Sequence, residues 1–328
     1  MPIRELPFGI VGHHLRAVIK QRVGRARVAV AACTLAAACS SASSTPSTAS
    51  QPSSQSSSAT VVDARPFTFT VRHELFVDTT RATAKPGDPA YDSKRTLPTD
   101  VYVPNASTPR PLIVFSHGYH GAPSKFSQIL GAWARSGYVV AAPQFPLTSD
   151  RGAPYDQVGD YLNQPGDISF LVTQLLNGPL RAQIDASRIG AAGLSLGGAT
   201  TYGLVEASCC RDTRIRAAAV FDGVRLPFAE PLGKNAVPLL ISHIDTDAAV
   251  PYTTAQEAFA DAAASPKWFL TFFNGIHPEA YEDAPSPHDF TATQTSIDFF
   301  DFTLLEDSSA GARLIQDGHN PGESTIIA

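Results

Sequence analysis

The stretch that decides the fold runs from Arg188 to Gly198 and reads Arg-Ile-Gly-Ala-Ala-Gly-Leu-Ser-Leu-Gly-Gly. An apolar run typical of a β-strand leads into the pattern G-x-S-x-G around Ser195, and a segment compatible with a helix follows, from Gly198 to about Ala207. Glycines two residues before and after such a serine remove the Cβ atoms that would collide in a tight turn, so that the hydroxyl projects above the sheet. The pattern predicts a nucleophile elbow with Ser195 as the nucleophile; an ordinary Gly-rich turn is the alternative.

Length and composition set limits on the rest of the chain. Its 328 residues are 43% hydrophobic, which is enough for a full core, and one α/β domain of about 240 residues with extensions fits better than two domains. The net charge is −5 and the basic residues of the body are scattered, so we expect no nucleic-acid partner. No zinc-type spacing or C-x-x-C pair occurs among the four cysteines, and we expect no metal site; the four are Cys33, Cys39, Cys209 and Cys210.

The N-terminal segment has the features of a targeting signal. Several basic residues precede the apolar run Val28–Ala38, which is too short to span a bilayer. The run ends in Leu-Ala-Ala-Ala-Cys at Cys39, which resembles the lipobox of a bacterial lipoprotein, where the cysteine is lipidated and becomes the mature N-terminus. We therefore expect residues 1–39 to be a signal peptide and the protein to be a lipid-anchored, extracytoplasmic lipoprotein. A competing match ends at Cys33, and plain secretion is the alternative.

Residues 40–64 are expected to form a flexible tether. Ser40–Ala59 is rich in Ser, Thr, Ala, Pro and Gln, a composition that buries too little apolar surface to offset the entropy of ordering. A lipidated cysteine followed by a tether would hold a globular body away from the membrane. The catalytic domain is then predicted to span residues 65–328.

Strands and helices are predicted to alternate after Arg65. Buried parallel strands read as continuous apolar runs, and the expected strands are 67–71, 74–78, 95–104, 111–116, 137–142, the run before Ser195, 215–221, 237–243 and 268–273. Apolar residues at helical spacing predict helices at 124–136, 167–176, 198–207, 251–264 and 290–305. This order favours a mostly parallel central sheet with helices on both faces. The strand at 268–273 is expected to be the last, and the tail to add one helical turn at Ala310–Gln316 before fraying.

The loop His117-Gly118-Tyr119 follows a buried strand, where an acyl-transfer site needs an oxyanion hole. A tetrahedral intermediate is stabilised by two preorganised backbone donors. We expect the N–H of Leu196 in the elbow to be one of them and the N–H of Tyr119 to be the other. Gly118 allows close approach of the backbone, and His117 is expected to orient the loop through hydrogen bonds.

An acidic segment, His243–Pro251, leaves the C-terminal end of another buried strand, which is where ligand sites lie in α/β sheets. A carboxylate there can hold a histidine in the productive tautomer and stabilise its imidazolium form. Asp245 and Asp247 are both candidates. We prefer Asp247, because its spacing to Val250-Pro251 fits the family pattern given below; Asp245 would otherwise stabilise the loop as an Asx turn.

His277 lies in the loop after the strand at 268–273, where it could take the proton from Ser195 and return it to the leaving group. His288, before the closing helix, is its rival. The chain order Ser195, Asp247, His277 is the order of the α/β-hydrolase triad. The elbow, the acidic loop and the histidine together favour a serine hydrolase.

From about Arg65 onwards the chain resembles the α/β-hydrolase superfamily, and within it the group of dienelactone hydrolases, chlorophyllases, platelet-activating-factor acetylhydrolases and bacterial polyester hydrolases. The resemblance is carried by Arg95-x-Leu97-Pro98…Tyr102-x-Pro104, Phe115-Ser116-His117-Gly118, Asp185-x-x-Arg188-Ile189…Gly193-x-Ser195-x-Gly197-Gly198 and His243-x-x-x-Asp247-x-x-Val250-Pro251. It implies an α/β-hydrolase fold and a cofactor-free Ser-His-Asp triad that cleaves carboxylic esters through an acyl-enzyme. Dienelactone hydrolases usually have a cysteine nucleophile, so Ser195 points away from that activity.

Alternatives to a simple esterase stay open at this point. A polyester hydrolase or a lipase of the same fold would act on a polymer or lipid ester instead of a small molecule. A non-catalytic envelope-binding protein on a hydrolase scaffold is an alternative of another class, although such a protein needs no elbow, acid loop or histidine. We expect a monomer.

The adjacent cysteines Cys209 and Cys210 are expected to be buried or free thiols, because neighbouring cysteines are strained partners for each other. A disulfide between them in an oxidising compartment is the alternative.

Overall fold

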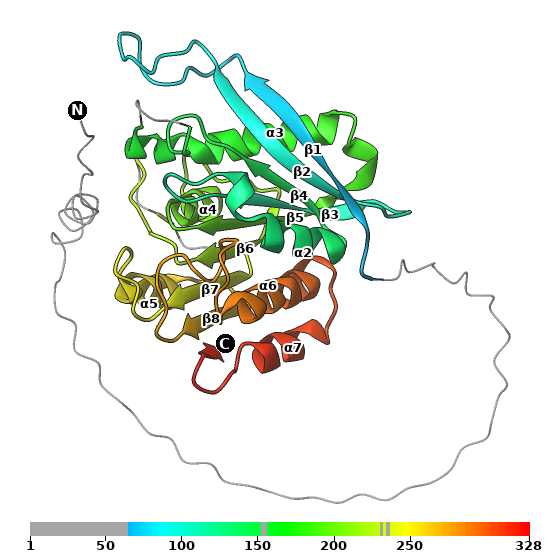
Figure 1. Cartoon of the computed structure of the whole chain (residues 1–328). Coiled ribbons are helices and arrows are strands. Elements are labelled where there is room, and N and C mark those ends of the chain that lie inside the picture. Colours follow the sequence, from blue (N-terminus) through cyan, green and yellow to red (C-terminus); the bar gives the residue numbers. More distant parts are fainter. Residues whose placement is uncertain (1–64, 152–155, 230–231, 234–236) are drawn as a thin grey trace, which may run out of the picture. The chain divides into compact units, whose positions relative to one another are not determined.

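In the part of the chain that the structure describes, nine strands form one sheet in the order β1-β2-β4-β3-β5-β6-β7-β8-β9 (Figure 1). The computed structural model describes residues 65–151, 156–229, 232–233 and 237–328, so the predicted signal peptide, Cys39 and the tether lie outside the described residues. The strands are β1 (Phe69–Asp78), β2 (Arg95–Pro104), β3 (Arg110–Ser116), β4 (Val139–Pro143), β5 (Ile184–Leu194), β6 (Ile215–Phe221), β7 (Leu239–Ile244), β8 (Lys267–Phe272) and β9 (Ser324–Ile327).

The middle of the sheet is parallel and its two ends are antiparallel. Strands β4, β3, β5, β6, β7 and β8 pair in parallel, whereas β1, β2 and β9 run antiparallel to their neighbours. All residues of β4 and β7 are buried, as expected for strands covered on both faces. The predicted α/β-hydrolase fold, with its mostly parallel sheet, is confirmed.

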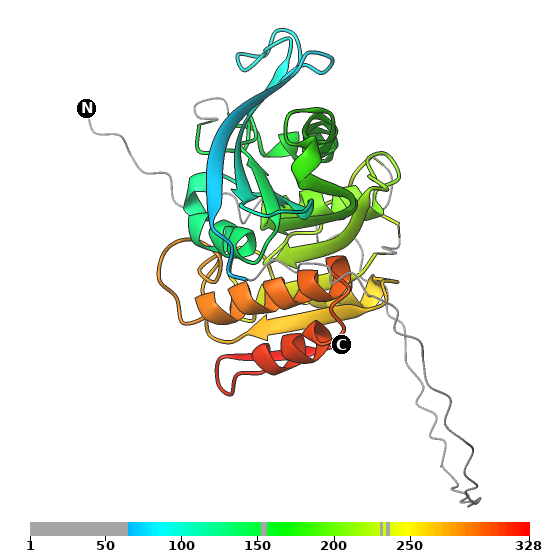
Figure 2. The same cartoon turned by 90° about the vertical axis from the view of Figure 1, so that its right-hand side faces the viewer.

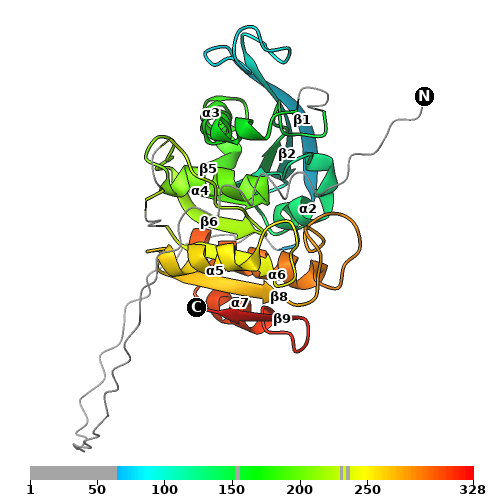
Figure 3. The same cartoon turned by 90° about the vertical axis from the view of Figure 1, so that its left-hand side faces the viewer.

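Helices cover both faces of this sheet (Figure 3), and the sheet separates the core into two clusters. On one face pack α2 (Ser127–Arg135), α6 (Asp289–Leu304) and α7 (Ala310–Asp317), with Trp133 and Phe300 fully buried. On the other face pack α3 (Gln164–Asn177), α4 (Leu196–Glu206) and α5 (Tyr252–Asp261). Three short 3₁₀ helices complete the described elements: η1 (Pro123–Lys125), η2 (Val158–Leu162) and η3 (Arg181–Gln183). None of the helices in the described ranges is both long and apolar enough to cross a membrane.

The N-terminal edge of the sheet differs from the prediction, because the two strands expected at 67–71 and 74–78 are one continuous strand, β1. Its register with β2 runs without a break from the pair Phe69 and Pro104 to the pair Asp78 and Arg95. Much of β1 is exposed, so its side chains did not have to follow a regular apolar alternation. The backbone ladder to β2 holds this strand in place.

The C-terminal tail also corrects the prediction, since the strand at 268–273 is not the last. After α6 the chain forms the helix α7, which packs beside α6 (Figure 2). Leu314 of α7 is buried. It then adds β9, which pairs with β8 from Phe272–Ser324 to Phe269–Ile327. A strand of four residues is too short to show a period of its own, and the neighbouring edge of β8 determines its position.

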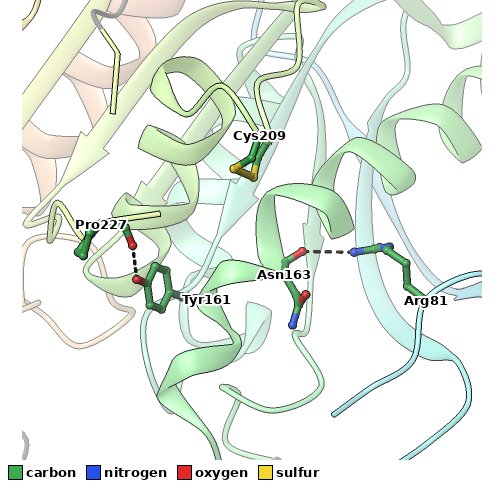
Figure 4. The surroundings of a disulfide bond; sticks show 6 residues. Arg81, Tyr161, Asn163, Cys209 and Pro227 are labelled. Carbon is green, nitrogen blue, oxygen red and sulfur yellow. Dashed lines mark hydrogen bonds between the residues drawn. A yellow bond between two sulfur atoms is a disulfide. The ribbon is translucent and has the colours of Figure 1, made fainter. Parts of the chain in front are cut away.

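A third correction concerns the adjacent cysteines, which are joined by a disulfide bond (Figure 4). They follow α4 in a turn in which the carbonyl of Ala207 accepts the N–H groups of Cys210 and Arg211, and Cys209 is exposed. The expectation of free thiols rested on the strain between adjacent cysteines, and the structure nevertheless joins their sulfur atoms within this turn. Figure 4 also shows Tyr161 of η2 donating its hydroxyl hydrogen to the carbonyl of Pro227, which attaches the loop after β6 to η2.

Candidate active site

Ser195 stands at the sharp turn between β5 and α4. Its φ of 54° and ψ of −115° are a conformation that a residue with a side chain seldom adopts. Three backbone hydrogen bonds hold it there: its N–H donates to Phe221 at 2.9 Å, and its carbonyl accepts from Gly198 at 2.9 Å and from Val224 at 3.1 Å. Such a strained strand-to-helix turn is the geometry of a nucleophile elbow.

Gly193 and Gly197 make this turn sterically possible. A Cβ added to Gly193 would lie 2.0 Å from the carbonyl oxygen of Gly197. A Cβ added to Gly197 would lie 1.9 Å from the carbonyl oxygen of Ser116, at the end of β3. Both obstacles are backbone atoms that cannot rotate away. The two glycines of the motif are therefore required by close backbone packing.

We expect Gly197→Ala to lower the free energy of unfolding by about 3 kcal/mol or more, because the methyl group would force the elbow away from β3. Urea unfolding followed by circular dichroism measures the change. Gly159→Ala is the matched control, since an added Cβ there meets no atom of the described residues within 4 Å. Equal unfolding midpoints for the two variants would contradict the close packing of the elbow.

The loop after β3 lies against Ser195, and His117 joins this loop to the start of the loop after β4. This histidine is buried; its Nδ1–H donates to the carbonyl of Gly118 at 2.7 Å, and its Nε2 accepts the N–H of Phe145 at 3.1 Å. These two bonds require the neutral ring, and burial lowers the pKa of His117 to about 4. A Cβ added to Gly118 would lie only 3.1 Å from the Cβ of Ser195, so the loop touches the candidate nucleophile.

Each of the two predicted oxyanion donors directly follows, in the sequence, one of the two residues of this contact. Tyr119 directly follows Gly118 in the loop, and Leu196 is the first residue of α4. The first N–H groups of a helix have no intrahelical acceptor, which suits them to bind an anion. The geometry thus brings the backbone segments of both donors to Ser195.

Asp247 and His277 form a hydrogen-bonded pair at the same edge of the sheet. The Nδ1–H of His277 donates to Oδ2 of Asp247 at 2.7 Å, and Oδ1 of Asp247 accepts the N–H groups of Ala249 at 2.7 Å and Val250 at 2.9 Å. The Asp247 side chain is fully buried, while that of His277 is 15% exposed. An imidazole held through Nδ1 has its Nε2 available for another partner.

The pKa values of this pair move in opposite directions. Burial acts to lower the pKa of His277, but the hydrogen bond from its ring to Asp247 and the charges of Asp222 and Asp247 outweigh burial and raise it. Burial acts to raise the pKa of Asp247, but the bond from His277 and the charge on that ring lower it. Both shifts favour the state in which the histidine is positively charged, as required of a base that accepts a proton.

The rival residues have other partners. Oδ1 of Asp245 accepts the N–H of Asn274 at 2.8 Å, which links the β7 and β8 loops. His288 is buried against the ring of Phe272, and its Nε2 lies 3.6 Å from Oε1 of Glu279. Of the candidate acids and histidines, the structure thus pairs Asp247 with His277.

Two further residues lie at this site for which the sequence predicted no role. His243 in β7 is fully buried; its Nε2–H donates to the carbonyl of Val250 at 2.9 Å and lies 3.5 Å from Oδ2 of Asp247. The second is Asp222, which directly follows β6 and is completely buried. The available signal for Asp222 was its position, because an acid directly after a buried strand lies at the edge of the sheet that carries the site.

Asp222, Asp247 and His277 each bring one ligand atom within 4.8 Å of the others. Among the described residues, these three form a carboxylate–histidine group that could bind a cation. Two of these three residues, His277 and Asp247, are already joined to each other by the hydrogen bond between Nδ1 and Oδ2. The contacts therefore fit an acid–base group better than a metal site.

The parallel strands β3, β5, β6, β7 and β8 all contribute to this site from their C-terminal ends, which supply His117, Ser195, Asp222, Asp247 and His277.

A search of curated proteins found no match to the chain. Residues 78–224, a little under half of the chain, match the family model described as Chlorophyllase, an α/β-hydrolase-related family. The match includes Ser195 and ends before Asp247 and His277. The chain therefore has the α/β-hydrolase fold, and its similarity to this family supports a hydrolase activity in general.

Proposed function

We propose that the protein is a serine hydrolase that cleaves carboxylic esters through an acyl-enzyme, with Ser195 as nucleophile, His277 as general base and Asp247 as its acid partner. The observation that carries this proposal is the 2.7 Å bond between His277 Nδ1 and Asp247 Oδ2, at the edge of the sheet where the elbow presents Ser195. The order of the three residues along the chain is that of the α/β-hydrolase triad.

The proposed reaction has two similar halves. Oγ of Ser195 attacks the ester carbonyl while Nε2 of His277 takes its proton, and Asp247 stabilises the resulting imidazolium. The N–H groups of Leu196 and Tyr119 stabilise the oxyanion of the tetrahedral intermediate. Its collapse breaks the bond to the alkoxide, which takes the proton from Nε2 and leaves as the alcohol. Water, deprotonated by the same ring, then attacks the acyl-enzyme. The bond between the acyl group and Oγ of Ser195 breaks, Oγ takes the proton back from Nε2, and the acid is released.

Hydrolysis of a p-nitrophenyl ester with a short acyl chain tests the proposed chemistry. We expect turnover that survives treatment with EDTA, because no step uses a metal ion. Loss of turnover on chelation and its return with a divalent cation would contradict the serine mechanism and favour a cation at the acid–histidine group. An envelope-binding protein on a hydrolase scaffold would show no turnover.

The size of the substrate is a separate question. Ile276, which precedes His277 in the chain, is 69% exposed, and an exposed apolar side chain next to the proposed base fits an ester with an apolar part, including the lipid and polyester substrates of the alternative activities. A panel of p-nitrophenyl esters of increasing acyl length, with a triglyceride emulsion and a polyester film, would distinguish an esterase, a lipase and a polyester hydrolase.

We expect Asp247→Asn to reduce kcat/KM far more than Asp245→Asn, because only Asp247 is bonded to His277. An asparagine cannot supply the negative charge that stabilises the imidazolium. Asp245→Asn retains an oxygen that can accept the N–H of Asn274, so its loss should be small. Initial rates with the same ester give both values, and a larger loss for Asp245→Asn would move the acid role to that residue.

We further propose that the enzyme is held at a membrane by lipid on Cys39. It is then a monomer, and the molecule that it binds is its ester substrate. The support is the sequence pattern alone, because Cys39 lies outside the described residues. One acyl chain gives only marginal membrane binding, with a K of about 10⁴ M⁻¹, so a cysteine carrying two or three chains would explain stable retention.

Cys39→Ala should therefore release the protein from the membrane fraction or block its processing. Mass spectrometry of the mature N-terminus of the unchanged protein should find a lipid-modified Cys39. An unmodified N-terminus beyond Cys39 would instead indicate plain secretion.

A further inference from the structure

Asp222 is a buried carboxyl group that the proposed triad does not use. Its φ of 42° lies in the left-handed region, which an aspartate adopts less easily than glycine. Its N–H donates to the carbonyl of Ser242 at 2.9 Å, and its Oδ1 accepts the N–H of Ile244 at 2.8 Å. These bonds hold the carboxyl group at one position beside the end of β7.

The other oxygen of this carboxyl, Oδ2, is buried and has no hydrogen-bond partner among the described residues. Leaving a buried carboxylate oxygen unpaired is costly, and such groups call for an explanation beyond packing. One oxygen of Asp222 lies within 4.8 Å of both a ring nitrogen of His277 and an oxygen of Asp247. The unpaired oxygen thus belongs to a group that stands beside the proposed base.

The surroundings of Asp222 make its charge depend on His277. Burial raises the pKa of Asp222 to about 7, the charge of His277 acts to lower it, and the charge of Asp247 acts to raise it further. In turn, Asp222 is among the groups whose charge raises the pKa of His277. A positive imidazolium and an ionised Asp222 therefore stabilise each other.

We propose that Asp222 is a second acid partner of His277. It is a positioning residue that stabilises the imidazolium together with Asp247 and takes over part of that role when Asp247 is replaced. This inference rests on the proposed function for its catalytic consequence. When Oγ of Ser195 transfers its proton to Nε2, the positive charge on the ring faces two carboxyl groups instead of one.

A double-mutant cycle tests this role. We expect Asp222→Asn to cost no more than about threefold in kcat/KM and Asp247→Asn about 300-fold, because Asp222 still supports the ring. The double variant should lose about 10⁴-fold, the loss expected of a triad without any acid. That loss exceeds the product of the single effects by about tenfold, which is within the range of measured couplings between neighbouring residues.

Asparagine at 222 retains the shape of the side chain and an oxygen for the N–H of Ile244. Asp245→Asn combined with Asp247→Asn is the control and should give only the product of the single losses. If the loss of kcat/KM in the double variant of Asp222→Asn and Asp247→Asn is also only the product of the single losses, Asp222 has only a structural role and the proposal is wrong.

Titration of the His277 ring by NMR gives a readout that does not depend on activity. Other charged or titratable groups near His277 and Asp222 are Asp247, His243, Glu279, Tyr281 and Glu282, and all of them stay unchanged in the Asp222→Asn variant. The pKa of His277 should fall in this variant, and the acidic limb of kcat/KM should move to lower pH with it.

These outcomes separate the two proposals. An unchanged His277 titration in the Asp222→Asn variant would overturn the role of Asp222, even in a fully active esterase. A shifted titration in a protein without ester turnover would retain the interaction between Asp222 and His277 while overturning the proposed function.

Discussion

Replacing Ser195 with alanine is expected to lower kcat for ester hydrolysis by about 10⁶-fold, because removing the nucleophile of a comparable triad has an effect of this size. The fold should remain, since the backbone bonds that hold the elbow involve the N–H and carbonyl of residue 195 and not its hydroxyl. Steady-state kinetics with a p-nitrophenyl ester give the rates, and circular dichroism gives the fold.

Ser187→Ala is the matched control for this prediction. Ser187 lies in the same strand, β5, near its N-terminal end, and its hydroxyl donates to Asp185 at 2.6 Å. It should retain the activity of the unchanged protein. Substantial turnover by Ser195→Ala would show that another group performs the attack.

The second large effect is expected for His277→Ala, which should lose nearly as much activity as the serine variant. Without the ring, no group takes the proton from Oγ during the attack, and members of such a triad act as a unit. The same assay applies, with His288→Ala as the control, since His288 is buried beside Glu279 and Phe272 and is not paired with Asp247.

His288→Ala should retain most of the activity. The reverse result, with the larger loss at position 288, would transfer the role of base to His288. In the unchanged protein the base must be neutral, so kcat/KM should fall as the pH drops through the raised pKa of His277.

The sequence was most informative where short-range sterics determine the structure. The elbow could be predicted because Gly193 and Gly197 are required by backbone contacts within and beside the same turn. The central strands could be predicted because burial on both faces requires continuous apolar runs. The preference for Asp247 came from its spacing to Val250-Pro251, which resembles the family pattern, and the structure gives this residue a direct bond to His277, although its role stays a prediction.

Features that depend on contacts distant in the chain could not be predicted in the same way. Strand β9 has only four residues and owes its place to the edge of β8. Asp222 looks like any acid after a strand until the fold brings it within 4.8 Å of Asp247 and His277. The disulfide between the adjacent cysteines depends on the turn at the end of α4, which local pattern does not reveal.

The central claim is that Ser195 forms a covalent intermediate, and labelling with a fluorophosphonate tests it most directly. The reagent reacts with an activated serine, and mass spectrometry of the digested protein locates the adduct. We predict one adduct per chain, on the peptide that contains Ser195, and none in the Ser195→Ala or His277→Ala variants. An unlabelled native protein, or an adduct that persists in Ser195→Ala, would contradict the proposed function.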